Sequence, residues 1–551
     1  MDNGHTFNLI STPWIPVIRT SGRRDCIRPA DLTDGIDADP IIDIDWPRGD
    51  FRCAKLEFLI GLLTVACPPR DNWDGWWTQP PPKAELEAAF AALAAVFSFD
   101  GNGPRAYQDL EDFACEPTRV EALLIEAPGV AAMKKNSALL VKPGRIEVMS
   151  RSAAAVALLT LQTMAPAGGA GHRTSLRGGG PLTTLVVPTR PATLWHRLWA
   201  NVPPGDAPAK PTEFSRIFPW LAPTRLSNKD GRTTTPENVD WRQALFGMPR
   251  RIRLDFEPNA GRIACDLTGA IDGVIVRTYR TRPHGMNYDA WGGVHPLTPH
   301  YRSKASDPIR YPVHGQDGRF GYRQWVAMLY GAKDGLREPA LCVSHFVTHR
   351  KDDLPRSDQF FRLMAAGYDM DNMKARAFIE AETPDITAPE GDSHAVADKA
   401  RDFVAAANEV AGALGHAVKI ALYGEDADKR IQRLNDTTLL TTVRDRFWED
   451  TNDRFFATLN AFSTLPAEEL VGDAAMPMAR AWCTVMERAA LAIFDDMAPM
   501  QDALSSNVKR VVEGRRFLVR TLLGYGARGV ELFKNLQLPV PESKTGKGKA
   551  A

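Results

Sequence analysis

Long apolar runs and a basic amino-terminal leader are both missing from this chain of 551 residues. The longest apolar run, 56–67 (LEFLIGLLTVAC), has twelve residues and contains Glu57, whereas a membrane-spanning helix needs roughly 18–20 apolar residues. Residues 1–18 are polar and then strand-like, unlike a secretory leader. We therefore interpret 56–67 as a buried helix, and we expect a cytoplasmic protein that does not enter a membrane.

Clustered cysteines are also missing. The seven cysteines are odd in number, and no two of them lie within four residues of each other. This scatter fits neither a disulfide framework nor a zinc site built from closely spaced thiols. We expect reduced thiols at Cys26, Cys53, Cys67, Cys115, Cys265, Cys342 and Cys483.

The chain has no overall excess of charge, because 67 Lys and Arg are balanced by 67 Asp and Glu. Phosphate contacts need cationic side chains, so this balance argues against a nucleic-acid binder if the charges are evenly spread. They are not evenly spread. Residues 507–551 contain ten basic residues and three acidic ones, a net charge of +7.

Three cations of this basic segment are placed to share one helix face. Arg516 and Arg520 are four residues apart, and Lys509 lies two turns from Arg516. Such a face can contact the phosphates of a DNA backbone. A solvated helix face followed by a basic tail explains the same pattern, and the sequence leaves both interpretations open.

No set of residues in the sequence supplies a nucleophile, a base and an orienting group together. The GxGxxG letters at 524–529 follow a basic helix rather than a strand, so they do not predict a dinucleotide site. His345 and His349 have the spacing of two zinc ligands but lack a third. We expect no catalytic activity, metal or cofactor. The alternative is a metal-dependent nuclease or hydrolase that uses these histidines or the Asp43 and Asp45 pair.

The length predicts two to four domains, and the sequence pattern changes near residue 385. Residues 1–385 mix helical stretches with β-rich pieces at 183–188, 251–256 and 273–279, joined by long loops. Residues 386–551 show apolar stripes at helical spacing. We expect an α+β protein with a large mixed α/β N-terminal domain and a C-terminal antiparallel four-helix bundle. The four stripes begin at Val396, Leu440, Trp482 and Val508.

The most unusual stretch is glycine-rich and spans 165–186 (APAGGAGHRTSLRGGGPLTTLV). Clustered glycines indicate unusual backbone angles or close approach of another backbone. Without β-carbons, a main chain can enter the minor groove of DNA, which is about 6 Å wide. A flexible surface loop is the simpler interpretation of the composition alone.

This stretch and its surroundings resemble the CasA family, the large subunits of the type I-E CRISPR surveillance complex Cascade. The resemblance rests on NLI at 8–10, WIPV at 14–17, NSALLVKPG at 136–144 and SLRGGGPLTT at 175–184, and it extends over essentially the whole chain. It implies a non-catalytic antiviral defence subunit. The implied partners are the Cascade backbone and small subunits, CRISPR guide RNA, double-stranded target DNA and an effector helicase-nuclease.

The resemblance also implies where DNA is recognised. Members of this family read the protospacer-adjacent motif of the duplex, largely from the minor groove, and begin to separate the strands. By resemblance, Arg280 or Arg282 would reach the motif. The loop in the minor groove would consist of Ala167, Gly168, Gly169, Ala170 and Gly171, with Arg173 beside it.

Three further elements follow from the same resemblance. A hairpin tip within 367–374 would drive a side chain between base pairs, either Asn372 or an apolar wedge formed by Met370 or Met373. Lys509, Arg516 and Arg520 would contact the DNA backbone. The loop expected to engage the guide-RNA handle and a neighbouring subunit contains Leu139, Val141, Lys142 and Gly144.

Besides the nuclease or hydrolase, a purely structural scaffold subunit is the other alternative to this DNA-recognition function.

Overall fold

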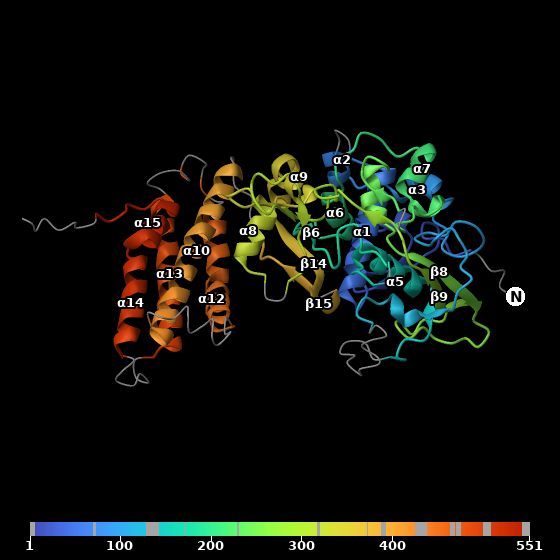
Figure 1. Ribbon diagram of the computed structural model, residues 1–551. Helices are drawn as coiled ribbons and strands as arrows, with labels where there is room; N and C mark the ends of the chain where they lie inside the picture. The colour runs from blue at the N-terminus through green and yellow to red at the C-terminus, as the bar shows by residue number, and fades with distance from the viewer. Residues whose placement is uncertain are drawn as a thin grey trace, which may run out of the picture. The chain divides into compact units, whose positions relative to one another are not determined.

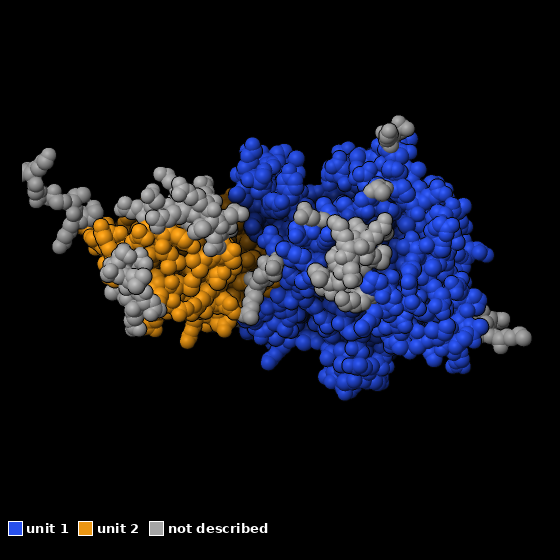
Figure 2. All heavy atoms as spheres, turned by 60° about the horizontal axis from the view of Figure 1, so that its bottom comes forward, with its two compact units in different colours: residues 1–317, 336–385 blue, residues 318–335, 386–551 orange. Residues whose placement is uncertain are grey.

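The chain folds into two compact units, which Figure 2 colours blue and orange. Unit 1 contains residues 1–317 and 336–385, and unit 2 contains residues 318–335 and 386–551. Within the ranges described, no helix is both long and apolar enough to cross a membrane. The structure is a computed structural model that describes residues 6–69, 73–127, 143–169, 171–228, 231–316, 320–371, 373–386, 393–424, 438–462, 465, 469, 475–499 and 508–542.

Unit 1 mixes helices with small sheets, which are antiparallel except for the parallel pair of β7 and β10 (Figure 1). Its described helices are α1 Gly49–Ala66, α2 Trp73–Thr78, α3 Lys83–Ala94, α5 Arg151–Met164, α6 Leu194–Ala200, α7 Phe214–Ile217 and α9 Leu341–His345. Its described strands are β1 Ile15–Arg19, β2 Arg24–Ile27, β3 Ile41–Ile44, β4 Thr118–Arg119, β5 Met149–Ser150, β6 Thr183–Pro188, β7 Thr233–Thr234, β8 Arg251–Pro258, β9 Val274–Arg282, β10 Asn287–Tyr288, β11 His300–Tyr301, β12 Tyr311–Pro312, β13 Arg337–Glu338, β14 Phe361–Asp371 and β15 Lys374–Glu382.

The centre of unit 1 is α1, which contains most of the apolar run seen in the sequence. Leu59, Ile60, Leu62 and Leu63 have no solvent exposure, and the helix packs against α5. A helix that is apolar on all sides can be stable only when it is covered on all sides. The prediction of a buried helix is therefore confirmed.

Two antiparallel pairings place the segments of functional interest. In one sheet β14 lies between β6 and β15, with Leu363 opposite Val186 and Tyr368 opposite Phe378. In another, β8 pairs with β9, so that Arg251 lies opposite Arg282. The first sheet holds the end of the glycine-rich stretch beside the β14–β15 hairpin. The predicted strands at 183–188, 251–256 and 273–279 correspond to β6, β8 and β9.

Unit 2 is helical and contains the predicted four-helix bundle. Its core includes Trp482, which is fully buried and stacks on Phe403 with ring centroids 6.1 Å apart. The described helices are α8 Tyr322–Tyr330, α10 Ser393–Tyr423, α12 Thr438–Phe462, α13 Met476–Met497, α14 Val508–Leu522 and α15 Gly526–Asn535.

Two helices of unit 2 were not expected. Helix α15 follows α14 across the GxGxxG letters, where Gly524 and Gly526 have φ of +85° and +80° and form the turn between the helices. Helix α8 comes from a segment that the sequence places in the N-terminal domain of 1–385. It joins unit 2 because Tyr322 stacks on Phe455 of α12, with ring centroids 4.2 Å apart.

Candidate nucleic-acid interface

The glycine loop, defined here as residues 165–180, connects α5 to β6 and is closed by its own backbone. The N–H of Gly180 donates to the carbonyl of Met164 at the end of α5 (3.0 Å). Further in, the N–H of His172 donates to the carbonyl of Gly169 (2.8 Å). These bonds make the loop a compact structure with a tight turn at its outer end.

Gly169 forms the exposed tip of this turn. Its φ is +68°, and no atom lies within 4 Å of the place where a β-carbon would be. Gly168 is also exposed and Ala167 is half-buried. Gly171 has φ +83° but is packed, because a β-carbon there would lie 2.9 Å from His284 Nδ1. Ala170, also predicted to contact DNA, lies outside the described residues.

Two arginines support the loop from within the protein. Arg173 donates from Nε to Ser227 Oγ and from Nη2 to the carbonyl of Ser227, both at 2.8 Å. Arg250 donates to the carbonyl of Pro166, and burial lowers its pKa to about 10. Arg173 was predicted to face DNA, but its guanidinium is engaged in bracing the loop.

A buried ion pair anchors the other end of the loop to α1. Nη2 of Arg177 lies 2.7 Å from a carboxylate oxygen of Glu57, and both side chains are almost fully buried. Arg177 also donates to Thr183 (3.0 Å) and Thr298 (2.9 Å). A buried charge needs such complete pairing to be tolerated, so the loop has a fixed attachment.

The second group of glycines, 178–180, serves internal packing. A β-carbon at Gly179 would lie 2.8 Å from Pro166 Cα, and one at Gly180 would lie 2.7 Å from the carbonyl oxygen of Tyr368. Close approach of one backbone to another requires glycine at these positions. The structure thus brings the base of the glycine loop against strand β14, which leads to the hairpin tip.

Of the two predicted wedge residues that the structure describes, the hairpin tip exposes one. Met373 is 52% exposed with φ +64°. Met370 is half-buried, and its Cγ is 2.9 Å from the position of a β-carbon at Gly180. Asp369 is buried in an ion pair with Arg376 (2.7 Å). Asn372 lies outside the described residues.

The two candidate arginines for motif contact differ in their surroundings. Arg280 is half-buried, lies 3.2 Å from Asp255 and donates to the carbonyl of Cys115. Arg282, at the end of β9, is exposed, with its guanidinium carbon 5.9 Å from the ring centre of Phe113. It lies two residues from His284, which contacts Gly171. Arg282 is therefore the better placed of the two.

Of the four residues predicted for the docking loop, only Gly144 is described. Gly144 has φ +77°, and its N–H donates to Glu121 (2.8 Å). Leu139, Val141 and Lys142 lie outside the described residues.

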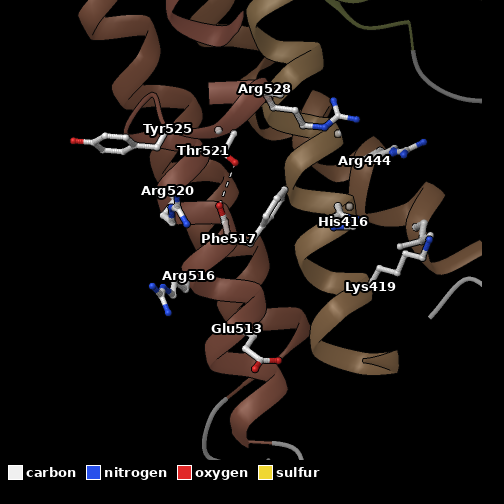
Figure 3. Close-up of a pocket in the computed structure, with 15 residues that line it drawn as sticks. His416, Lys419, Arg444, Glu513, Arg516, Phe517, Arg520, Thr521, Tyr525 and Arg528 are labelled. Carbon is white, nitrogen blue, oxygen red and sulfur yellow. Dashed lines mark hydrogen bonds between the residues drawn. The ribbon is translucent and has the colours of Figure 1, made fainter. Parts of the chain in front are cut away.

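Two of the three residues of the predicted cationic face in unit 2 line a pocket, and the third does not. Arg516 and Arg520 are exposed and line a pocket between helices (Figure 3). Lys509 lies 3.8 Å from Glu513 and does not line that pocket. Sequence reasoning did not find Lys419 and Arg444, which line the same pocket from other helices. The spacing of Gly415, His416 and Lys419 on one helix face was the available signal.

The two aspartates of the catalytic alternative pair with arginines. Asp43 pairs with Arg197 (2.9 Å) and Asp45 with Arg24 (3.3 Å). His345 and His349 lie with ring centroids 5.0 Å apart. Across the described ranges, no three His, Cys, Asp or Glu side chains are grouped so that they could hold a metal ion.

Comparison with known proteins identifies one family and its fold. The profile of the family described as CRISPR-associated protein Cse1 matches residues 8–493. CasA of Thermus thermophilus is 20% identical with a TM-score of 0.67, covering 94% of this chain and 100% of that one. Cse1 of Acidimicrobium ferrooxidans is 16% identical, covers 98% and 100%, and has a TM-score of 0.67. A chain of a CRISPR RNA-guided surveillance complex is 15% identical, covers 94% and 100%, and has a TM-score of 0.62.

Proposed function

The chain belongs to the CRISPR-associated protein Cse1 family, and on that premise we propose that it is the non-catalytic large subunit of a type I-E Cascade complex. In this role it recognises the protospacer-adjacent motif of double-stranded DNA through the minor groove and starts unwinding. The observation that supports this most strongly is the position of Gly169, which forms an exposed tip without a side chain on a loop that internal arginines hold in place.

The neighbouring elements support the same function. The exposed Met373 at the hairpin tip has the character of an apolar wedge, a device by which minor-groove proteins unstack bases. Asn372 remains the other candidate. Arg282 would supply the cation near the motif, because its guanidinium is exposed and Arg280 is tied to Asp255.

The proposed partners follow from the family. The chain would dock on the backbone and small subunits and on the guide RNA through the 139–145 loop, and would help to recruit an effector helicase-nuclease. The matched surveillance-complex structures support membership of such an assembly. We place this assembly in the cytoplasm.

The test introduces Gly169→Asp into the complex reconstituted with guide RNA. Asp tolerates positive φ better than most residues, and the site is open, so the fold should be retained. We expect the preference for one flanking motif, worth roughly 1–3 kcal/mol per mismatched base pair, to be lost in binding to a library of randomised flanks.

Gly269→Asp is the matched control, because Gly269 has φ +70° with nothing within 4 Å, on the turn between β8 and β9. Unchanged motif preference in Gly169→Asp would contradict the proposed function. Equal loss in both variants would show that the effect does not come from the glycine loop.

A further inference from the structure

Four helices of unit 2, namely α10, α12, α14 and α15, line an open pocket of about 790 Å³. Its floor is a glycine-bearing face of α10. A β-carbon at Gly412 would lie 2.7 Å from Arg528 Nη1, and one at Gly415 would lie 3.3 Å from Arg444 Nε. The two guanidiniums therefore lie close over α10 where it has no side chains. The volume falls within the roughly 300–1,000 Å³ of typical ligand sites.

Positive charge dominates the pocket lining. Arg528 pairs with Glu409 (3.0 Å), and Glu513 is the only carboxylate among the described lining residues. Within the described ranges, Arg444 and Arg516 have no acidic partner, and neither does Arg520. The lining cations are Lys419, Arg444, Arg516, Arg520 and Arg528.

Aromatic rings lie between and beside these cations. Figure 3 shows Arg516 and Arg520 on one side of the pocket and Lys419 and Arg444 on the other, with Phe517 between them. Phe517 is half-buried and meets the ring of His416 at 4.7 Å between centroids. Cations around an aromatic ring are the combination that binds phosphates and a base together.

We propose that this pocket binds a nucleotide of single-stranded DNA, with its base against Phe517 and the neighbouring phosphates on Arg444 and Arg516. A duplex cannot fill it in this way, because its bases are stacked on each other and present no free face to Phe517. The proposal rests on the proposed function in one respect, namely that DNA is the ligand of the protein. It adds a second site, which binds the separated strand and not the motif in the duplex.

The first test measures the contribution of the base. Fluorescence anisotropy compares an oligothymidylate with an abasic strand of equal length, both binding to the full chain. We expect the wild-type chain to prefer the oligothymidylate by roughly fivefold or more, the lower range for stacking on an aromatic side chain. Phe517→Leu should bring the ratio close to one and leave the salt dependence unchanged. Equal binding of the two strands by the wild-type chain would overturn the proposal.

The second test measures the phosphate contacts. Arg444→Gln should lower the slope of log affinity against log salt by about 0.7, the value for one phosphate on a single strand. Arg446→Gln is the matched control, since Arg446 lies on the same helix but pairs with Asp450 (3.7 Å) and Asp496. Both residues are exposed, so neither variant should disturb folding. Identical slopes for the two variants would overturn the proposal.

Two further measurements separate this proposal from its alternatives. Thymidine monophosphate should compete only weakly with the oligothymidylate, and competition at equal nucleotide concentration would show a site for free nucleotides instead. In the reconstituted complex, Phe517→Leu should retain motif preference on duplex DNA. Loss of motif preference in this variant would overturn the separation of the two sites, whereas failure of the single-strand tests alone leaves the proposed function intact.

Discussion

The glycine loop of unit 1 and the pocket of unit 2 both contain several arginines, but the two regions use them differently. Arg173, Arg177 and Arg250 each donate to protein oxygens within or beside the loop. Arg444 and Arg516 have no acidic partner in the described part of the chain. One region uses its cations to fix a shape, and the other leaves them available to a ligand.

This difference matters for the kind of recognition each region can provide. A guanidinium whose N–H groups are taken up by protein oxygens has fewer donors left for a phosphate, so a surface braced in this way presents a fixed shape rather than phosphate contacts. Unpaired cations attract phosphates irrespective of sequence and lose strength as salt rises. A net charge of zero is therefore compatible with DNA binding, because several cations without an acidic partner in the described part of the chain lie together at the pocket.

The largest effect on stability is expected when the buried ion pair that anchors the glycine loop is removed. Arg177→Met leaves Glu57 buried without its cation, and breaking a buried pair in this way costs about 3–5 kcal/mol. We expect the free energy of unfolding to fall by that amount, measured by urea unfolding with tryptophan fluorescence. The double variant Arg177→Met with Glu57→Leu should recover much of the loss.

The matched control is Arg515→Gln in unit 2. Arg515 forms an exposed pair with Asp495 (2.9 Å), and exposed pairs contribute about 0–1 kcal/mol. A similar loss in both variants would show that the Arg177 pair is not structurally special.

A smaller effect is expected where α14 meets α10 beneath the pocket. A β-carbon at Gly514 would lie 2.5 Å from the carbonyl oxygen of Ala417. Gly514→Ala gains about 1 kcal/mol of helix propensity, but overpacking costs about 1–3 kcal/mol. We expect a net loss of about 0–2 kcal/mol in urea unfolding, towards the upper end because the contact is with a backbone atom. Val512→Ala, on the exposed side of α14, should change stability by less than about 0.5 kcal/mol, and a stabilised Gly514→Ala would refute the close packing.

Local pattern was enough to predict most of the elements that carry the two regions, with α15 of the pocket as an exception. The run at 56–67 has no polar face, so its burial in α1 follows from composition. Strand β6 begins and ends at the predicted residues 183–188. The four long helices of unit 2 follow from apolar residues at three- and four-residue spacing.

Partners distant in sequence were beyond such reasoning. Glu57 and Arg177 are 120 residues apart, and each looks like an isolated charge until the fold pairs them. The sequence suggested a DNA contact for Arg173 because its partner Ser227 lies 54 residues away. The pocket was missed for the same reason, since its walls come from separate helices. Helix α8 was assigned to the wrong unit because Tyr322 reveals its partner only in three dimensions.

The salt dependence of DNA binding distinguishes the arginines of the pocket from those of the glycine loop, with variants that should not disturb the fold. Arg516→Gln should reduce the salt slope of single-strand binding by about 0.7, while Arg173→Gln should leave that slope unchanged and weaken motif preference of the assembled complex. Arg515→Gln is the control for Arg516, since the neighbouring side chain is paired with Asp495. Anisotropy titrations over a range of salt concentrations measure the slopes. A reduced slope in Arg173→Gln would contradict the division between shape and charge.

The smallest effect concerns proton uptake at His416. Its pKa is lowered from 6.5 by burial and then by Lys419 and Arg528, so the imidazole is neutral at pH 7 in the free protein. A bound phosphate adds negative charge and raises that pKa, so binding takes up a proton. Affinity for a single strand should therefore rise as pH falls through the bound-state pKa and level off below the free-state pKa. The other charged groups lining the pocket are Arg444, Glu513, Arg516 and Arg520.

The gain in affinity should stay below about tenfold. A rise of one pKa unit on binding would correspond to a factor of ten, and we expect the bound phosphate to raise the pKa by less than that. Titrations between about pH 5 and 8 cover the range in which histidine changes charge. His416→Gln should remove the dependence while keeping the affinity found at high pH. If His416→Gln kept the full pH dependence, another group would take up the proton, and the imidazole of His416 would not respond to the bound strand. The glycine loop provides the contrast, since motif preference should stay constant over this range if recognition there depends on shape.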